Sequence, residues 1–336
     1  MIVFASRAGM TPAALVAEDR VVLQRANLSA RVTITGIIED YTGAEISIRT
    51  EAGEPLRTYP SAEVIEIQTA QTDSQTRGLR LLADGHSEEA VREFDQALKQ
   101  EPRIWVRREI LAALVRCGLR QGDWVAAGTR FLALVKSDPK TRHFSLMPLI
   151  WAPETISRDA RGAARLWLDG ATEPARLIGA SLLYDDAEWG KEARSALKPL
   201  SSSADSRVRS LAQMQAWREE ALRGSPGVRQ TAQWQRRVDE LPEELRAGPS
   251  FLLGRAYAAL RDYEMAAAAY LWLPLVDDHD FRLAARACLD AGRALEAIGQ
   301  TIEAHTLFLE VSERFADTPF AAEARAWMER AEQKSR

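Results

Sequence analysis

The chain has 336 residues, of which 46% are hydrophobic and 27% are charged, and its formal net charge is -4. This composition is typical of a folded globular protein, and the slight acidic excess argues against a general nucleic-acid binder, because such domains usually carry a basic face. No apolar run of the sequence approaches the ~20 residues that a membrane-spanning helix needs. At ~150 residues per domain, the length predicts either two or more domains or an array of repeats.

Residues 1–17 are rich in apolar and small side chains and end in Ala-Leu-Val-Ala, directly before the charged Glu18. This pattern resembles the end of a secretory signal peptide that is cleaved after Ala17. Two features oppose that interpretation, because no positive residue precedes the apolar stretch and Arg7 interrupts it. We therefore expect either the remnant of a signal peptide, and hence a periplasmic or secreted protein, or a disordered tail on a cytoplasmic one.

Residues 18–69 show the hydrophobic period of two that marks β-strands, as where Val32 and Ile34 alternate with polar residues. Five short strands separated by turn residues are enough to close a small barrel. Their order resembles an SH3-like or Sm-like barrel, and modules of that kind often bind peptides. The aromatic residues available to such a groove are Tyr41 and Tyr59, which are otherwise structural tyrosines at the barrel rim.

From residue 70 onward the sequence is rich in alanine and leucine with helical periodicity, and the stretch Ser250–Leu273 shows its organisation most clearly. Gly254 lies on a first helix and Ala266 on a second, with a turn between them. Small residues at these positions let two antiparallel helices approach closely, while a tyrosine fills the space beside the contact. Such a hairpin cannot bury its apolar face alone, so we expect similar neighbours on either side.

The same spacing of 12 residues between small positions recurs along the chain. The positions that make up this pattern are Gly78, Ala90, Phe94 and Pro102, then Ala127, Phe131 and Pro139, then Gly254, Tyr257, Ala266 and Tyr270, and finally Gly292, Ala304 and Phe308. They resemble the tetratricopeptide repeat (TPR), although Val115 replaces one small residue and neighbouring copies are spaced more widely than usual. The resemblance implies TPR-like helical repeats over residues 70–145 and 225–336, the second set ending in a capping helix.

Residues 146–224 do not follow this spacing, but they contain a different repeat. Ala175 and Val208 begin two similar segments 33 residues apart, and Asp205 is placed to cap the second helix. This pattern resembles a pair of HEAT-like units. The predicted fold is therefore mainly α: a right-handed α-solenoid, TPR-like with a HEAT-like centre, preceded by the small SH3-like β-barrel.

Side chains that could carry chemistry are few. Asp277, Asp278, His279 and Asp280 could hold a divalent cation only if a loop folded them together, and capping of the next helix by Asp278 or Asp280 is the favoured alternative. We expect His86 and His143 to be exposed in turns, and the two cysteines, Cys117 and Cys288, to be buried structural thiols. The sequence therefore predicts no catalytic residue, no cofactor and no metal site.

Two functional hypotheses follow. The first is a non-enzymatic scaffold or adaptor for protein–protein interaction, which binds a partner peptide or protein on the concave face of the helical array, as the resemblance to bacterial-envelope TPR proteins implies. The alternative is an envelope enzyme or ligand-binding factor with its site at the junction of barrel and solenoid, near Tyr41, Tyr59 and His86. Neither hypothesis involves nucleic acid or a membrane span.

Overall fold

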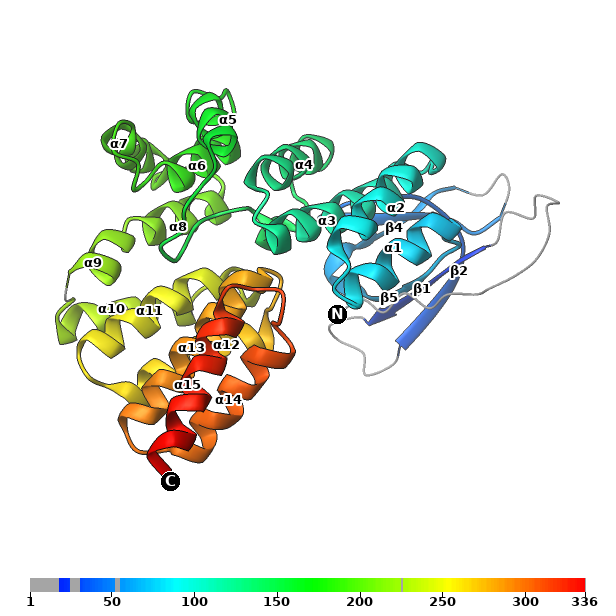
Figure 1. Cartoon of the computed structure of the whole chain (residues 1–336). Helices are drawn as coiled ribbons and strands as arrows, with labels where there is room; N and C mark the ends of the chain where they lie inside the picture. Colours follow the sequence, from blue (N-terminus) through cyan, green and yellow to red (C-terminus); the bar gives the residue numbers. More distant parts are fainter. Residues whose placement is uncertain (1–17, 25–30, 52–54, 225, 336) are drawn as a thin grey trace. The chain divides into compact units, whose positions relative to one another are not determined.

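A computed structural model describes residues 18–24, 31–51, 55–224 and 226–335 (Figure 1). The expected signal remnant or tail at residues 1–17 lies outside the described residues. The chain is mainly helical, with a small antiparallel sheet near its N-terminus. It forms two compact units: unit 1 comprises Met1–Cys117 and Thr129–Phe144, and unit 2 comprises Gly118–Gly128 and Ser145–Arg336.

The sheet of unit 1 has five antiparallel strands in the order β4-β3-β2-β1-β5. The strands are β1 (Asp19–Gln24), β2 (Arg31–Tyr41), β3 (Glu45–Arg49), β4 (Arg57–Pro60) and β5 (Val64–Gln68), and a single 3-10 turn, η1 (Ser61–Glu63), separates the last two. The first half of β2 pairs with β1 and its second half with β3. The expected closed barrel is not found, because β4 and β5 stand at opposite ends of the strand order among the described residues.

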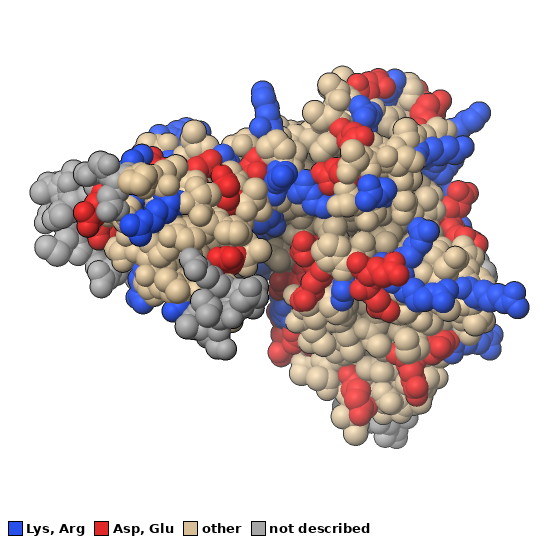
Figure 2. Space-filling view, turned by 180° about the vertical axis from the view of Figure 1, so that it is seen from behind, with Lys and Arg blue, Asp and Glu red and all other residues tan. Residues whose placement is uncertain are grey.

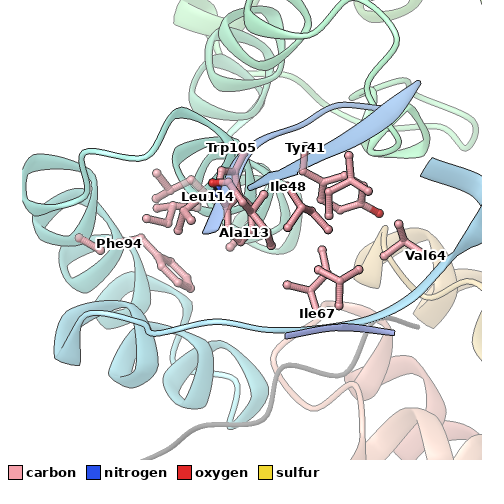
Figure 3. Packing of buried hydrophobic residues seen from close by; sticks show 14 of the residues in the cluster. Tyr41, Ile48, Val64, Ile67, Phe94, Trp105, Ala113 and Leu114 are labelled. Atoms are coloured by element: carbon pink, nitrogen blue, oxygen red, sulfur yellow. Dashed lines mark hydrogen bonds between the residues drawn. The ribbon is translucent and has the colours of Figure 1, made fainter. Parts of the chain in front are cut away.

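Helices cover the apolar face of this sheet, which explains why the sheet does not have to close on itself. They are α1 (Asp73–Ala83), α2 (Ser87–Gln100) and α3 (Ile104–Gln121). Phe94 of α2 and Trp105 of α3 belong to the same buried cluster as Ile48, Val64 and Ile67 of the strands (Figure 3). The sheet and these helices therefore share one hydrophobic core.

Trp105 fixes the position of α3 against the sheet. Its indole N–H donates to the carbonyl oxygen of Ile38 at 3.2 Å, and the ring of Tyr41 packs edge-on against it with centroids 6.5 Å apart. Only 2% of Tyr41 is exposed. The hydrogen bond gives a main-chain carbonyl group of the sheet a side-chain donor from α3.

A half-buried ion cluster holds the end of unit 1 against α3. Glu109 lies 2.5 Å from an Nη of Arg142 and 3.0 Å from Nε2 of His143, and the guanidinium of Arg142 also covers the ring of Tyr41. Burial alone would raise the pKa of the Glu109 carboxyl, but His143 and Arg142 outweigh it and hold that pKa at about 2. The expectation that His143 is exposed is wrong, because its side chain is half-buried as the partner of the Glu109 carboxylate.

The helices of unit 2 follow one another with short connections, and most neighbours in sequence pack against each other (Figure 1). They are α5 (Arg158–Leu168), α6 (Glu173–Leu182), α7 (Gly190–Leu200), α8 (Ser206–Gln215), α9 (Arg218–Arg223), α10 (Val228–Asp239), α11 (Ala247–Ala259), α12 (Tyr263–Val276), α13 (Phe281–Ala297), α14 (Thr301–Glu313) and α15 (Phe320–Ser335). Asp205 caps α8 as expected, accepting from the Arg207 N–H at 2.9 Å. None of the helices in the described part of the chain has the length and hydrophobicity of a bilayer-spanning segment.

Within the described residues, the same turn joins four helix hairpins: α1 to α2, α3 to α4 (Trp124–Ser137), α11 to α12, and α13 to α14. A residue with positive φ ends the first helix of each, and the next N–H donates to the carbonyl oxygen five residues earlier, as in a Schellman motif. The positive-φ residues are Gly85, Gly122, Arg261 and Gly299. The corresponding hydrogen bonds run from His86 to Leu81, Asp123 to Gly118, Asp262 to Tyr257 and Gln300 to Leu295, at 2.8, 2.9, 3.0 and 3.0 Å.

Three of these hairpins also share one helix contact. A Cβ added to Gly78, Gly254 or Gly292 would lie 2.7, 2.5 or 2.9 Å from the aromatic ring that faces it from the second helix. Those rings belong to Phe94, Tyr270 and Phe308, each no more than 1% exposed. The missing side chain therefore makes room for the ring, as the sequence pattern predicts.

The turn geometry predicts opposite effects of two substitutions. Gly299→Ala should lower the free energy of unfolding by about 1 kcal/mol, because an L side chain is strained at φ 83 and no atom lies near enough to clash with the added methyl. Arg261→Gly should stabilise the chain by about 0.5 kcal/mol, because it removes the strain at φ 60. The larger conformational entropy of glycine in the unfolded chain offsets part of this gain. Urea unfolding of both variants measures this, and a destabilising Arg261→Gly would contradict it.

Glu109→Gln should destabilise the chain by about 3 kcal/mol at pH 6, from the difference between a folded pKa of about 2 and a model value of 4.5. The contribution of a carboxylate with a lowered pKa is complete above ~pH 4.5 and is lost as the pH falls toward ~2, so roughly half of the difference should remain at pH 3. Urea unfolding at the two pH values gives both numbers. Glu45→Gln, at an exposed position of β3, is the matched control.

Candidate functional site

The connection between α4 and α5 passes through the interior of unit 2 as an extended segment, residues 147–154, which we call the strap. Its sequence is Met-Pro-Leu-Ile-Trp-Ala-Pro-Glu, and its first five residues are buried. Pro148 and Pro153 lack an N–H and restrict the residues before them, so a helix is disfavoured here. An extended chain inside a protein needs hydrogen-bond partners for its main chain, and the helices of unit 2 supply them at Ile150.

The main chain of Ile150 is bound by two side chains from different helices. Its N–H donates to Oγ of Ser181 on α6 at 2.8 Å, and its carbonyl oxygen accepts from Nε2 of Gln215 on α8 at 3.1 Å. Ser181 and Gln215 are 0% exposed, and the serine hydroxyl donates to the glutamine Oε1 at 3.0 Å. Together they pair both main-chain groups of the strap residue, much as a neighbouring β-strand would.

Arg218, at the start of α9, fixes the orientation of the Gln215 amide. One guanidinium nitrogen donates to Gln215 Oε1 at 3.0 Å and to the Ser181 carbonyl oxygen at 2.8 Å, and the other pairs with Asp185 at 2.9 Å. Only 2% of Arg218 is exposed, and this burial lowers its pKa to about 10 although Asp185 opposes the effect. With Oε1 held by two donors, Nε2 has to face the strap.

Side chains of the strap lie between α8, α11 and α13. The indole of Trp151 rests on the backbone of Gly248 in α11, where any Cβ would overlap the ring. Leu149 and Trp151 line a cavity of about 40 Å³ and a second of about 20 Å³, and Asp280 and Leu283 line both of them too. These cavities have room for a few waters but not for a small-molecule ligand, whose pockets usually exceed ~300 Å³.

Three carboxylates gather where the strap ends. Glu154 accepts from Arg282 at 2.7 Å, and Asp280 caps α13 by accepting from the Leu283 N–H at 3.0 Å. Burial raises the pKa of Asp280 to about 6, and the neighbouring carboxylates of Glu154 and Asp277 act in the same direction. At neutral pH the carboxylate of Glu154, at the end of the strap, is therefore repelled by the carboxylate of Asp280.

The acidic residues of the 277–280 segment make separate contacts and do not converge on one point. Asp280 is a helix cap, as expected, while Asp278 pairs with Arg314 at 2.7 Å and Asp277 contacts His279. Among the described residues, no group of three or more histidine, cysteine, aspartate or glutamate side chains could hold a metal ion. Cys117 and Cys288 are buried, as predicted.

Most of the predicted repeat positions are buried, and none of them lines either cavity. Eight of them are no more than 1% exposed: Ala90, Phe94, Ala127, Phe131, Ala266, Tyr270, Ala304 and Phe308. Tyr257 is half-buried, and Pro102 and Pro139 are exposed beyond the ends of α2 and α4. The sequence pattern therefore identified the packing of the hairpins and not the site beside the strap.

The residues expected at the junction of sheet and helices are not presented together as a ligand site. Tyr41 is in the core against Trp105, Tyr59 is half-buried on β4, and His86 is exposed at the start of α2. The strap residues were missed by the sequence reasoning. The signal that could have found them is an apolar run between two prolines in an otherwise helical region.

Asp280→Asn should stabilise the chain at pH 7.5 by on the order of 1–2 kcal/mol, and it should have little effect at pH 4. The range is smaller than the pKa shift alone implies, because the side chain is partly exposed. A raised carboxyl pKa means that the penalty of ionising Asp280 in the fold grows as the pH rises from ~4 to about 6. Asparagine keeps the cap without the charge. Thermal unfolding at both pH values measures the change, Asp262→Asn at the exposed cap of α12 is the control, and an equal gain at both pH values would contradict the assignment.

No protein-family model matches this chain. A search of curated proteins finds no match either. The contacts of the strap and the recurring hairpins are therefore the basis on which a function can be assigned.

Proposed function

We propose that the chain is a non-enzymatic scaffold or adaptor that binds a partner protein or peptide on the inner face of its helices. The observation that supports this most directly is the way unit 2 holds the strap. Buried side chains on two helices bind the N–H and carbonyl oxygen of one extended residue, Ile150. A helical surface equipped in this way holds an extended polypeptide through its main chain, whatever its side chains are.

The recurring hairpins support the same function. Identical turns and glycine-to-aromatic contacts favour a TPR-like solenoid with a HEAT-like centre, and solenoids offer extended inner surfaces to partners. The sheet of unit 1, with its shared long strand and its 3-10 turn before the last strand, favours the SH3-like comparison. The proposal includes no catalytic residue, cofactor or metal.

Charge and compartment complete the proposal. Basic and acidic side chains are interspersed over the face seen in Figure 2, which favours a protein partner over nucleic acid. A periplasmic or secreted location rests on the pattern of residues 1–17 alone, and a cytoplasmic one is the alternative.

Site-specific photo-crosslinking in extracts of the host cells tests the scaffold function. A photoreactive amino acid at His279, which lines the larger cavity and is 38% exposed, should capture a discrete partner that excess unlabelled protein competes away. The same group at Ile302, 79% exposed on α14, is the control and should capture none. Absence of a competed product at position 279 in folded protein, or the same products at both positions, would remove the proposal.

A further inference from the structure

We propose that the strap is an internal ligand that occupies the peptide site of unit 2, and that the partner is an extended peptide of the same apolar pattern that takes its place. This inference rests on the proposed scaffold function and identifies the partner and the regulation of that site. It follows from three properties of the strap: the hydrogen bonds of its main chain, the packing of its apolar side chains, and the charge of Glu154 at its end.

The main-chain contacts require an occupant that is itself a polypeptide. Ser181 and Gln215 are fully buried, and departure of the strap would leave their hydrogen bonds to Ile150 unmade. Buried polar groups without partners are unfavourable, so neither an empty groove nor a purely apolar ligand is a stable replacement. An extended peptide restores both bonds, because every residue except proline offers the same N–H and carbonyl oxygen.

The seated side chains give the sequence pattern of the partner. Met147, Leu149 and Trp151 all line the larger cavity, as alternate residues of an extended chain do when they share one face. At the third position, that of Trp151, the ring packs on the backbone of Gly248, a surface that suits an aromatic side chain. The partner should therefore carry two large apolar residues and then a tryptophan, each separated by one residue.

Space around the strap shows that its own side chains do not fill the groove. Cavities of about 40 and 20 Å³ remain beside Leu149 and Trp151. A larger side chain in place of Leu149 would make additional contacts there. A partner with phenylalanine at this position would gain an advantage over the strap.

The charged end of the strap gives a second advantage to a partner. Glu154 pairs with Arg282, and its carboxylate also acts on Asp280, whose pKa is raised first by burial and further by the charges of Glu154 and Asp277. His279 contacts Asp277, and Glu244 and Arg286 line the adjoining cavities. A peptide with glutamine in place of Glu154 removes one of the crowded charges, so it should displace the strap more readily above pH ~6 than below it.

Hydrogen exchange of the full wild-type chain tests whether the strap opens by itself. The Ile150 amide should exchange at least 100-fold faster than the slowest amides of α6 and α8, with a weaker dependence on denaturant. Exchange of Ile150 only together with those helices would show that the strap is a permanent part of the core and would overturn the proposal.

Binding in trans tests the identity of the occupant. A fluorescent peptide with the sequence of residues 145–156 should bind the full-length Leu149→Ser/Trp151→Ser variant at least 10-fold more tightly than it binds the wild-type chain. The same peptide with its tryptophan replaced by serine is the control and should not bind. If circular dichroism shows that the double variant is unfolded, Leu149→Ala replaces it.

The outcomes separate the strap from the scaffold. No binding of the peptide to the folded variant would contradict the assignment of the strap as a ligand. A partner captured at position 279 together with a protected Ile150 amide would keep the scaffold function and remove the role of the strap. Capture at neither position 279 nor position 302, even with a strap that opens, would remove the scaffold function and with it the displacing partner that this inference assigns.

Discussion

The need to pair every buried main-chain polar group shapes both units of this chain. In unit 1, the carbonyl oxygen of Ile38 receives the indole N–H of Trp105, which fixes a helix on the sheet. In the hairpins, the last carbonyl groups of each first helix are paired by the residues of the turn. In unit 2, Ser181 and Gln215 pair with the main chain of Ile150 where an extended segment crosses between helices. Hydrophobic burial supplies the stability, while this pairing decides where each segment can lie.

Sequence reasoning succeeded where a contact is local and periodic. The 12-residue spacing between small positions placed Gly254 and Ala266 on facing helices. Asp205 was expected as a cap, and of the two candidates Asp278 and Asp280 the second is the cap of α13. These features depend on residues a few turns apart, so their spacing is visible along the chain. The domain boundaries and the assignment to the TPR family stay predictions.

What could not be predicted depends on partners distant in sequence. The closed barrel was wrong because helices cover the apolar face of the sheet, which the strand pattern alone does not reveal. His143 was expected to be exposed because its neighbours are polar, whereas a carboxylate 34 residues earlier draws it inward. The pairing of Ile150 with Ser181 and Gln215 has no local signature at all, since serine and glutamine are common on helix surfaces.

The strap also bears on how unit 2 folds. In a linear row of repeats each element contacts only its neighbours, so folding can begin anywhere and spread. Here one short segment reaches side chains 31 and 65 residues away, and Glu154 pairs with Arg282 across 128 residues. Contacts between residues so far apart in sequence raise the contact order, which slows folding, and they join remote helices into one cooperative transition. Unit 2 should therefore unfold as a single body while the strap is seated, and divide into independently melting segments once it is released.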